Sequence, residues 1–147
     1  MQKDIIQKWF LQHPPSEVWE YLTKPELLEQ WLMKTDFQPI EGREFRFTFT
    51  AKPGRQYEGI VHCKVLEVKP FTKLSYSWQT DSAGGNKPVN SKVEWTLSPK
   101  ENGTALHLVH NGFTVLEDLA AHESGWNSCH KQLAELFKQT DHANTNT

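Results

Sequence analysis

Alternation of apolar and polar residues constrains the fold of this chain more than any other feature of its sequence. Phe45, Phe47 and Phe49 are separated by polar residues, and the same period of two recurs in several later segments: Val61, Cys63 and Val65; Leu74, Tyr76 and Trp78; Val93, Trp95 and Leu97; and Leu106, Leu108 and His110. Successive side chains of a strand point to opposite faces, so each segment predicts a strand with one apolar face. Short turns between consecutive strands make them antiparallel. With a first strand over residues 5–11, the pattern predicts a sheet of about six strands.

Polar stretches mark where these strands end. Residues 52–55 read as a turn, residues 81–88 as a glycine-rich loop, and Asn102-Gly103 as the tip of a hairpin. Asn111-Gly112 is expected to end the last strand.

The period changes to three and four near the C-terminus, which predicts one amphipathic helix from about Asp118 to about Lys138. Its apolar positions are Leu119, His122, Trp126, Cys129, Leu133 and Leu136 or Phe137. Gly125 lies inside this helix at a cost of about 1 kcal/mol relative to Ala, so we expect it to pack closely against a strand. The remaining residues, 142–147, are polar and are expected to form a disordered tail.

Two short helices are predicted after the first strand, over residues 16–22 and 25–32, each beginning beside proline. Thr23 and Glu26 have the spacing of a capping box for the second helix. The fold class is therefore α+β: a curved antiparallel sheet wrapped around a long C-terminal helix. We expect one domain over residues 1–141, and its length is sufficient for a core without disulfides or metals.

Composition excludes several classes of protein. Lys and Arg number 16 and Asp and Glu 18, giving a net charge of −2, whereas a nucleic-acid-binding protein should carry a basic face. The N-terminus has no apolar region typical of a signal peptide, and no stretch approaches the roughly 18 apolar residues of a membrane span. We therefore expect a cytoplasmic protein without nucleic-acid partners. In that compartment Cys63 and Cys129 should be reduced and buried.

Several motifs, in this order and spacing, resemble one known family. They are residues 14–19, 25–31, 67–70, 74–78, 110–113 and 122–126, which read PPSEVW, PELLEQW, EVKP, LSYSW, HNGF and HESGW. The chain resembles the bacterial homologues of the activator of heat-shock protein 90 ATPase from about Ile5 to Phe137. That family belongs to the helix-grip superfamily, which includes START lipid-transfer domains and polyketide cyclases. The resemblance implies a helix that stands off the sheet and leaves a pocket, but no shared catalytic motif.

Aromatic residues are abundant, with 6 Trp and 8 Phe. They form either an ordinary core or the wall of a ligand cavity, and buried Trp N–H groups each need a partner. The predicted ligand-binding residues are Trp31, Phe47, Tyr76, Trp78, Trp95, His110 and Trp126, with Trp31 near the mouth. His110 is the best candidate to orient an oxygen of the ligand.

No catalytic residue, cofactor or metal ligand is predicted. His107 and His110 point to opposite faces of a strand, and His122-Glu123 lacks the second histidine of a zinc motif, because Trp126 stands in its place. Ser124-Gly125 lacks the strand-to-helix context of a nucleophile elbow.

Three functions remain open. The first is binding of a hydrophobic or aromatic small molecule, such as a lipid, a polyketide or a flavonoid-like compound. The second is a cyclase-type enzyme, which would need inward polar residues in mutual reach, for which only His110, His122 and Tyr76 are available. The third is a co-chaperone that contacts an ATPase, for which a surface aromatic patch would be the signature.

Overall fold

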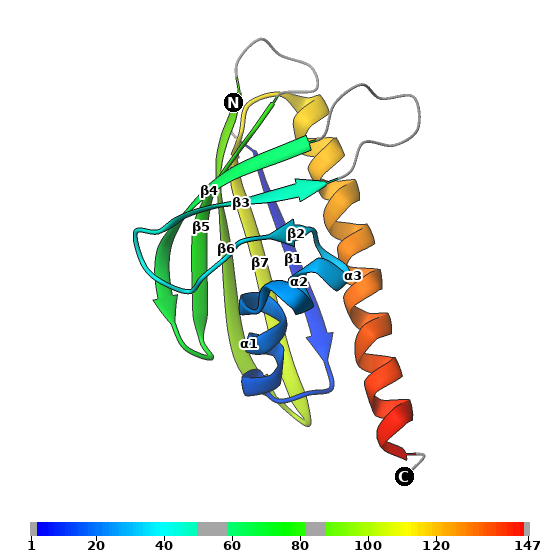
Figure 1. Ribbon diagram of the computed structural model, residues 1–147. Helices are drawn as coiled ribbons and strands as arrows, with labels where there is room; N and C mark the ends of the chain where they lie inside the picture. The colour runs from blue at the N-terminus through cyan, green and yellow to red at the C-terminus, as the bar shows by residue number, and fades with distance from the viewer. Residues whose placement is uncertain (1–2, 50–58, 82–87, 146–147) are drawn as a thin grey trace.

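The computed structural model describes residues 3–49, 59–81 and 88–145, arranged as a strongly curved sheet with three helices (Figure 1). The elements in chain order are β1 (Lys3–Leu11), α1 (Pro15–Thr23), α2 (Pro25–Trp31), β2 (Lys34–Thr35), β3 (Glu44–Phe49), β4 (Gly59–Lys69), β5 (Lys73–Thr80), β6 (Val89–Lys100), β7 (Gly103–Phe113) and α3 (Leu116–Thr145). The predicted turn at 52–55, Tyr57 and most of the loop at 81–88 lie outside the described residues.

All neighbouring strands are antiparallel, in the order β1-β7-β6-β5-β4-β3-β2. This confirms the α+β class and the antiparallel sheet. The described sheet has a seventh strand, β2, whose two residues Lys34 and Thr35 pair with Thr48 and Phe47 of β3. A strand of two residues is too short to show alternation, so the sequence pattern could not reveal it.

The alternating apolar residues form the inner face of the sheet, as expected. Those of β4 to β7 are at most 5% exposed, and Phe45 and Phe47 of β3 are equally buried. The side chain of Phe49 is outside the described part. The first strand contributes Ile5, Trp9 and Leu11 to the same core.

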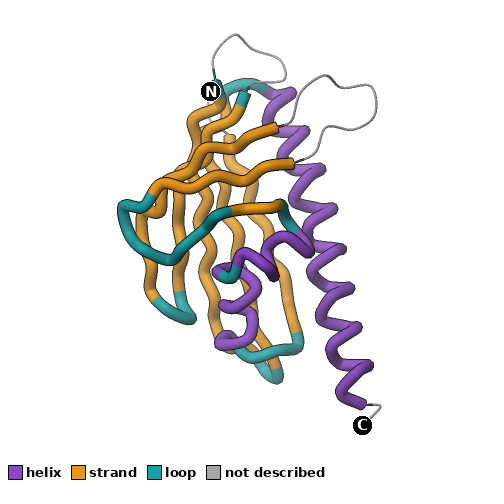
Figure 2. The backbone as a smooth tube through the Cα atoms, viewed as in Figure 1, coloured by secondary structure: helices purple, strands orange, loops and turns teal. Residues whose placement is uncertain are grey.

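Helix α3 runs along one side of the curved sheet, next to β1, and α1 and α2 lie to its left in the same view (Figures 1 and 2). It packs on β1 through the stacked rings of Trp9 and His130, with centroids 4.5 Å apart. A hydrogen bond of 3.0 Å from Gln7 Nε2 to Asn127 Oδ1 joins the same two elements.

The long helix differs from its prediction in two ways. It continues to Thr145, so residues 142–145 are helical and the expected disordered tail is wrong over that part; no Pro or Gly follows Gly125 to stop the helix. Gly125 is exposed, and a Cβ built there would meet nothing within 4 Å. The expected close packing at this glycine is therefore wrong.

Two local predictions are also corrected. Lys24, not Thr23, is the N-cap of α2, and no side chain caps it; the Thr23 hydroxyl instead donates to the carbonyl of Trp19 at 2.8 Å. Strand β7 runs through Gly112 to Phe113 rather than ending there. Gly112 has φ +109°, and a Cβ would lie 3.0 Å from the carbonyl oxygen of Asn90, so glycine permits the strand to continue.

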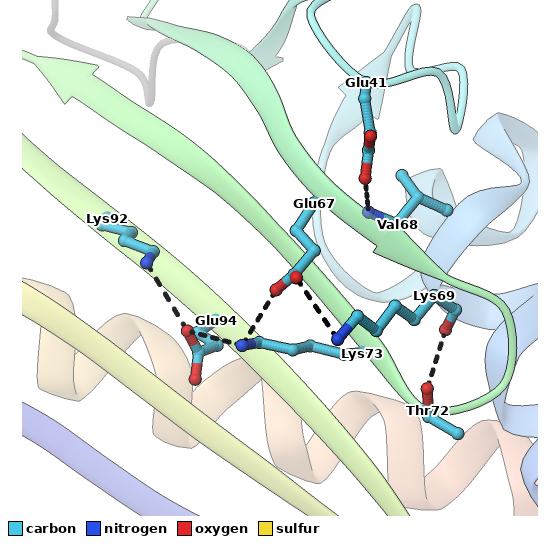
Figure 3. Close-up of polar contacts among 8 residues, drawn as sticks. All are labelled: Glu41, Glu67, Val68, Lys69, Thr72, Lys73, Lys92 and Glu94. Carbon is cyan, nitrogen blue, oxygen red and sulfur yellow. Dashed lines mark hydrogen bonds and ion pairs between the residues drawn. The ribbon is translucent and has the colours of Figure 1, made fainter.

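The outer face of the sheet carries a row of ion pairs that crosses β4, β5 and β6 (Figure 3). Lys73 Nζ lies 2.9 Å from Glu67 and 3.7 Å from Glu94, and Lys92 Nζ lies 3.6 Å from Glu94. The hydrogen bond from Lys73 lowers the pKa of Glu67, and the same bond raises the pKa of Lys73. These residues are on the solvent side, so charge and aromatic side chains occupy opposite faces of one sheet.

Candidate functional site

Five rings from four elements meet inside the sheet and form the inner aromatic cluster: Phe47 (β3), Tyr76 and Trp78 (β5), Trp95 (β6) and Trp126 (α3). Trp78 contacts three of the other rings: its ring centroid lies 5.5 Å from that of Phe47, 6.4 Å from that of Tyr76 and 5.5 Å from that of Trp126. Trp95 lies 5.4 Å from Trp126. Each ring is at most 4% exposed, so the cluster is closed from solvent by its neighbours.

The other two predicted site residues adjoin this cluster. Trp31 on α2 meets Trp95 at 6.0 Å and is itself only 3% exposed. His110 on β7 lies 5.4 Å from Trp78 and 5.9 Å from Trp126. The structure thus brings together all seven predicted residues.

Sequence reasoning missed Trp9, whose ring lies 5.3 Å from Trp95 and 6.2 Å from Trp31. The signal was present, because Ile5, Trp9 and Leu11 lie in phase along the first strand.

Five indole N–H groups of this region donate hydrogen bonds of 2.9–3.2 Å. They are Trp9 to Gln7 Oε1, Trp31 to the carbonyl of Tyr21, Trp78 to His122 Nε2, Trp95 to the hydroxyl of Tyr76, and Trp126 to His110 Nδ1. Such pairing is what allows large amphipathic rings to be buried without orphaned donors.

His110 is the centre of a hydrogen-bonded relay. Its Nδ1 accepts from Trp126 at 2.9 Å, so the neutral ring carries its proton on Nε2, which lies 2.8 Å from Ser91 Oγ. The Ser91 hydroxyl in turn donates to the carbonyl of Trp78 at 2.9 Å. Both ring nitrogens are therefore occupied, and His110 has no free atom with which to hold a ligand.

Burial keeps both interior histidines neutral. It lowers the pKa of His110 to about 2, and nearby His122 acts in the same direction. Burial also lowers the pKa of His122, although the carbonyl of Asp118 opposes this by accepting from Nδ1 at 2.8 Å. The Nε2 atom of His122 then has its lone pair free to accept from Trp78.

Ser91 was not predicted, although it lies in phase with the inward residues Val93 and Trp95. A polar residue at an inward position of a strand was the available signal. His122 was considered as a polar group but not as a partner of Trp78, because 44 residues separate them.

The two cysteines are free thiols, as expected. Cys63 is buried, whereas Cys129 is only partly so. Burial raises the pKa of both thiols, that of Cys129 to about 11. Neither is therefore an activated nucleophile.

Within residues 3–49, 59–81 and 88–145, no three His, Cys, Asp or Glu side chains are grouped so that they could hold a metal ion. None of the helices described there has the length and apolar character needed to cross a membrane.

Residues 12–138 match the family described as Activator of Hsp90 ATPase homolog 1-like protein. Among solved structures, protein MLL2253 from Mesorhizobium loti is 33% identical, with a TM-score of 0.81 over 94% of this chain and 98% of its own. CV1439 from Chromobacterium violaceum is 24% identical, with a TM-score of 0.77 over 91% and 96% of the two chains. DynU16, described as a putative protein in the dynemicin biosynthetic locus, is 23% identical, with a TM-score of 0.75 over 92% of this chain and 47% of its own. No curated protein matches the chain.

Proposed function

This chain belongs to the Activator of Hsp90 ATPase homolog 1-like family, and on that premise we propose that it binds a hydrophobic or aromatic small molecule, such as a lipid, a polyketide or a flavonoid-like compound, between the sheet and α3. The observation that carries the proposal is the inner aromatic cluster. Five rings from β3, β5, β6 and α3 meet at the interface of sheet and helix, and four of them are Trp or Tyr, which cores use sparingly because each N–H or O–H needs a partner. Ring faces offer stacking surfaces, and their burial against an apolar ligand contributes about 25 cal/mol per Å².

A ligand must displace a covering element, because the rings are closed from solvent. The covering element on the helix side is α3, which contacts the cluster through Trp126. An outward shift of its first half would break the hydrogen bonds from Trp126 to His110 and from Trp78 to His122, so ligand binding must offset their loss.

The known structures support the same proposal at the level of fold. DynU16, which shares this fold, is described as a protein of a biosynthetic locus. A cyclase-type enzyme has less support, because His110 has both nitrogens engaged and His122 donates to a backbone carbonyl, so within the described residues neither is a free acid or base.

Native mass spectrometry of freshly purified protein tests the proposal first, by looking for a retained small molecule. A titration with flat aromatic probes, followed by tryptophan fluorescence and melting temperature, tests it independently. Phe47→Leu should weaken binding of such probes, whereas Phe10→Leu, on the outer face of β1, should not. If no probe quenches the fluorescence or raises the melting temperature, the proposal is wrong.

A protein-binding role is the second candidate, and the outer face of β1 favours it. Ile6 is 62% exposed and Phe10 43% exposed on this edge strand, next to partly buried Val109 of β7. A co-chaperone that uses this patch should change the rate of ATP hydrolysis by a heat-shock protein 90 ATPase. Ile6→Ser with Phe10→Ser should abolish that effect while leaving probe binding intact.

A further inference from the structure

The polar groups of the inner aromatic cluster differ in what they can still bind. The indole hydrogens of Trp78, Trp95 and Trp126 already have acceptors, and His110 uses both nitrogens. A ligand that bound any of these groups would have to break an existing hydrogen bond, which gains little.

Tyr76 is the exception. Its hydroxyl oxygen accepts from Trp95 Nε1 at 2.9 Å, and that is its only hydrogen bond within the described residues. A phenol is both acceptor and donor, so its hydrogen remains available. The side chain is 2% exposed, so among the described residues the hydroxyl hydrogen is a buried donor without an acceptor, which is uncommon in native interiors.

The described neighbours of this hydroxyl are weak acceptors. Cys63 of β4 and Cys129 of α3 act on it electrostatically, and each raises its pKa, after burial as the main cause. Thiol sulfur is a weak acceptor, and Cys63 is itself directed to the carbonyl of Val61 at 3.9 Å. The rings of Phe45, Phe47 and Phe37 lie around the tyrosine, with centroids 5.3–6.3 Å from its own.

We propose that the Tyr76 hydroxyl is the polar anchor of the ligand site, and that the ligand is a flat apolar molecule bearing a ketone or quinone carbonyl, whose oxygen accepts this hydrogen. The inference rests on the proposed small-molecule function and replaces His110 as the group that orients the ligand. A carboxylate is disfavoured, because its charge would be buried without a cation. An alcohol is disfavoured as well, since its own hydrogen would then face only weak acceptors.

Three probes of nearly equal shape test this: 9-fluorenone, fluorene and 9-fluorenol, which carry a carbonyl, a methylene and a hydroxyl group at the same position. Equilibrium dialysis against the wild-type protein should give a Kd for fluorenone about fivefold below that for fluorene, the effect of one net hydrogen bond. Fluorenol should bind no better than fluorene. Tyr76→Phe should bind fluorenone and fluorene alike, and Tyr21→Phe is the matched control that should keep the preference.

The outcomes separate the two proposals. If fluorene and fluorenone both bind but Tyr76→Phe keeps the fivefold preference, the assignment of Tyr76 is overturned while small-molecule binding stands. Fluorenol binding as tightly as fluorenone would overturn the carbonyl class. If none of the three probes binds, the proposed function fails, and this inference fails with it.

Infrared spectroscopy of the wild-type complex gives a second readout that needs no variant, because Tyr76→Phe also leaves the Trp95 N–H unpaired and could impair folding. The carbonyl stretch of bound fluorenone should move to lower frequency than in cyclohexane. A carbonyl band at the same frequency as in cyclohexane would show that the ligand accepts no hydrogen bond from Tyr76, and would overturn the proposal.

Discussion

The burial of His110 should make folding stability depend on pH by a calculable amount. In the unfolded chain the imidazole has a pKa of about 6.5, whereas burial in the native state lowers the pKa of His110 to about 2. Below pH 6.5 the unfolded state therefore binds a proton that native His110 does not take. The contribution of neutral His110 to the free energy of unfolding is fully present above pH 6.5 and is lost as the pH falls from there towards 2.

The magnitude follows from linkage. One pKa unit corresponds to about 1.4 kcal/mol, and pH 5 lies about 1.5 units below the unfolded pKa, so His110 should remove about 2 kcal/mol of stability between pH 7 and pH 5. His122 and His130 also have pKa values lowered mainly by burial and act with the same sign. A single substitution is needed to isolate the contribution of His110.

Urea unfolding at pH 7 and pH 5, followed by circular dichroism, measures this contribution in His110→Gln. The loss of stability between the two pH values should be about 2 kcal/mol smaller in the variant than in the wild type. His107→Gln removes an imidazole from the outer face of the same strand and sets the baseline. A variant whose loss on acidification equals that of this control would refute the buried, neutral assignment of His110.

Three further predictions concern glycine, cysteine and the serine of the relay. Gly112→Ala should destabilise the protein by more than about 1 kcal/mol, since its φ is +109° and Asn90 lies in contact. Gly125→Ala should stabilise it by about 0.5–1 kcal/mol, because a methyl group there meets no neighbour. Urea midpoints check both, and a Gly125→Ala variant less stable than Gly112→Ala would contradict the structure. Cys129 should react with a thiol reagent at pH 8 far more slowly than a free thiol, because its pKa is raised to about 11; complete modification within minutes in the native state would contradict this. Ser91→Ala should lower the free energy of unfolding in urea by about 1–3 kcal/mol, because it leaves the buried Nε2–H of His110 without an acceptor. A loss below about 0.5 kcal/mol would contradict the hydrogen bond from His110 to Ser91.

Side-chain periodicity predicted the parts of the fold that depend on local order. Inward positions on five strands and the long helix follow from spacings of two, three and four, and they include six of the seven candidate site residues; the seventh, Trp31, lies on the short helix α2. The unexpected features depend on a neighbour in space. At Gly112 a side chain would press against the carbonyl oxygen of Asn90 in β6, and the two residues of β2 form a strand because they pair with β3. The absence of a close neighbour at Gly125 is likewise a property of the assembled structure.

The candidate site shows the same division. Alternation placed His110 inside but could not show that Trp126 and Ser91, 16 and 19 residues away, would occupy its two nitrogens. Tyr76 was grouped with the other rings, because the pairing of its hydroxyl with Trp95 depends on the register between β5 and β6. The sequence prediction gave the polar role to His110, whose two nitrogens are engaged in the structure, whereas the proposed anchor is Tyr76.

The pairing of β1 with β7 has a consequence for how the protein is made. Leu11 pairs with Thr104 and Lys3 with Phe113, so β1 leaves the ribosome roughly a hundred residues before β7, its partner in the described sheet. At 5–20 residues per second that delay is about 5–20 s. During this interval Trp9 and the apolar side of an unpaired strand are exposed in the nascent chain. Efficient biosynthesis should accordingly depend on protection of the N-terminal segment until β7 emerges, and slow translation should raise aggregation more than it does for proteins with mainly local contacts.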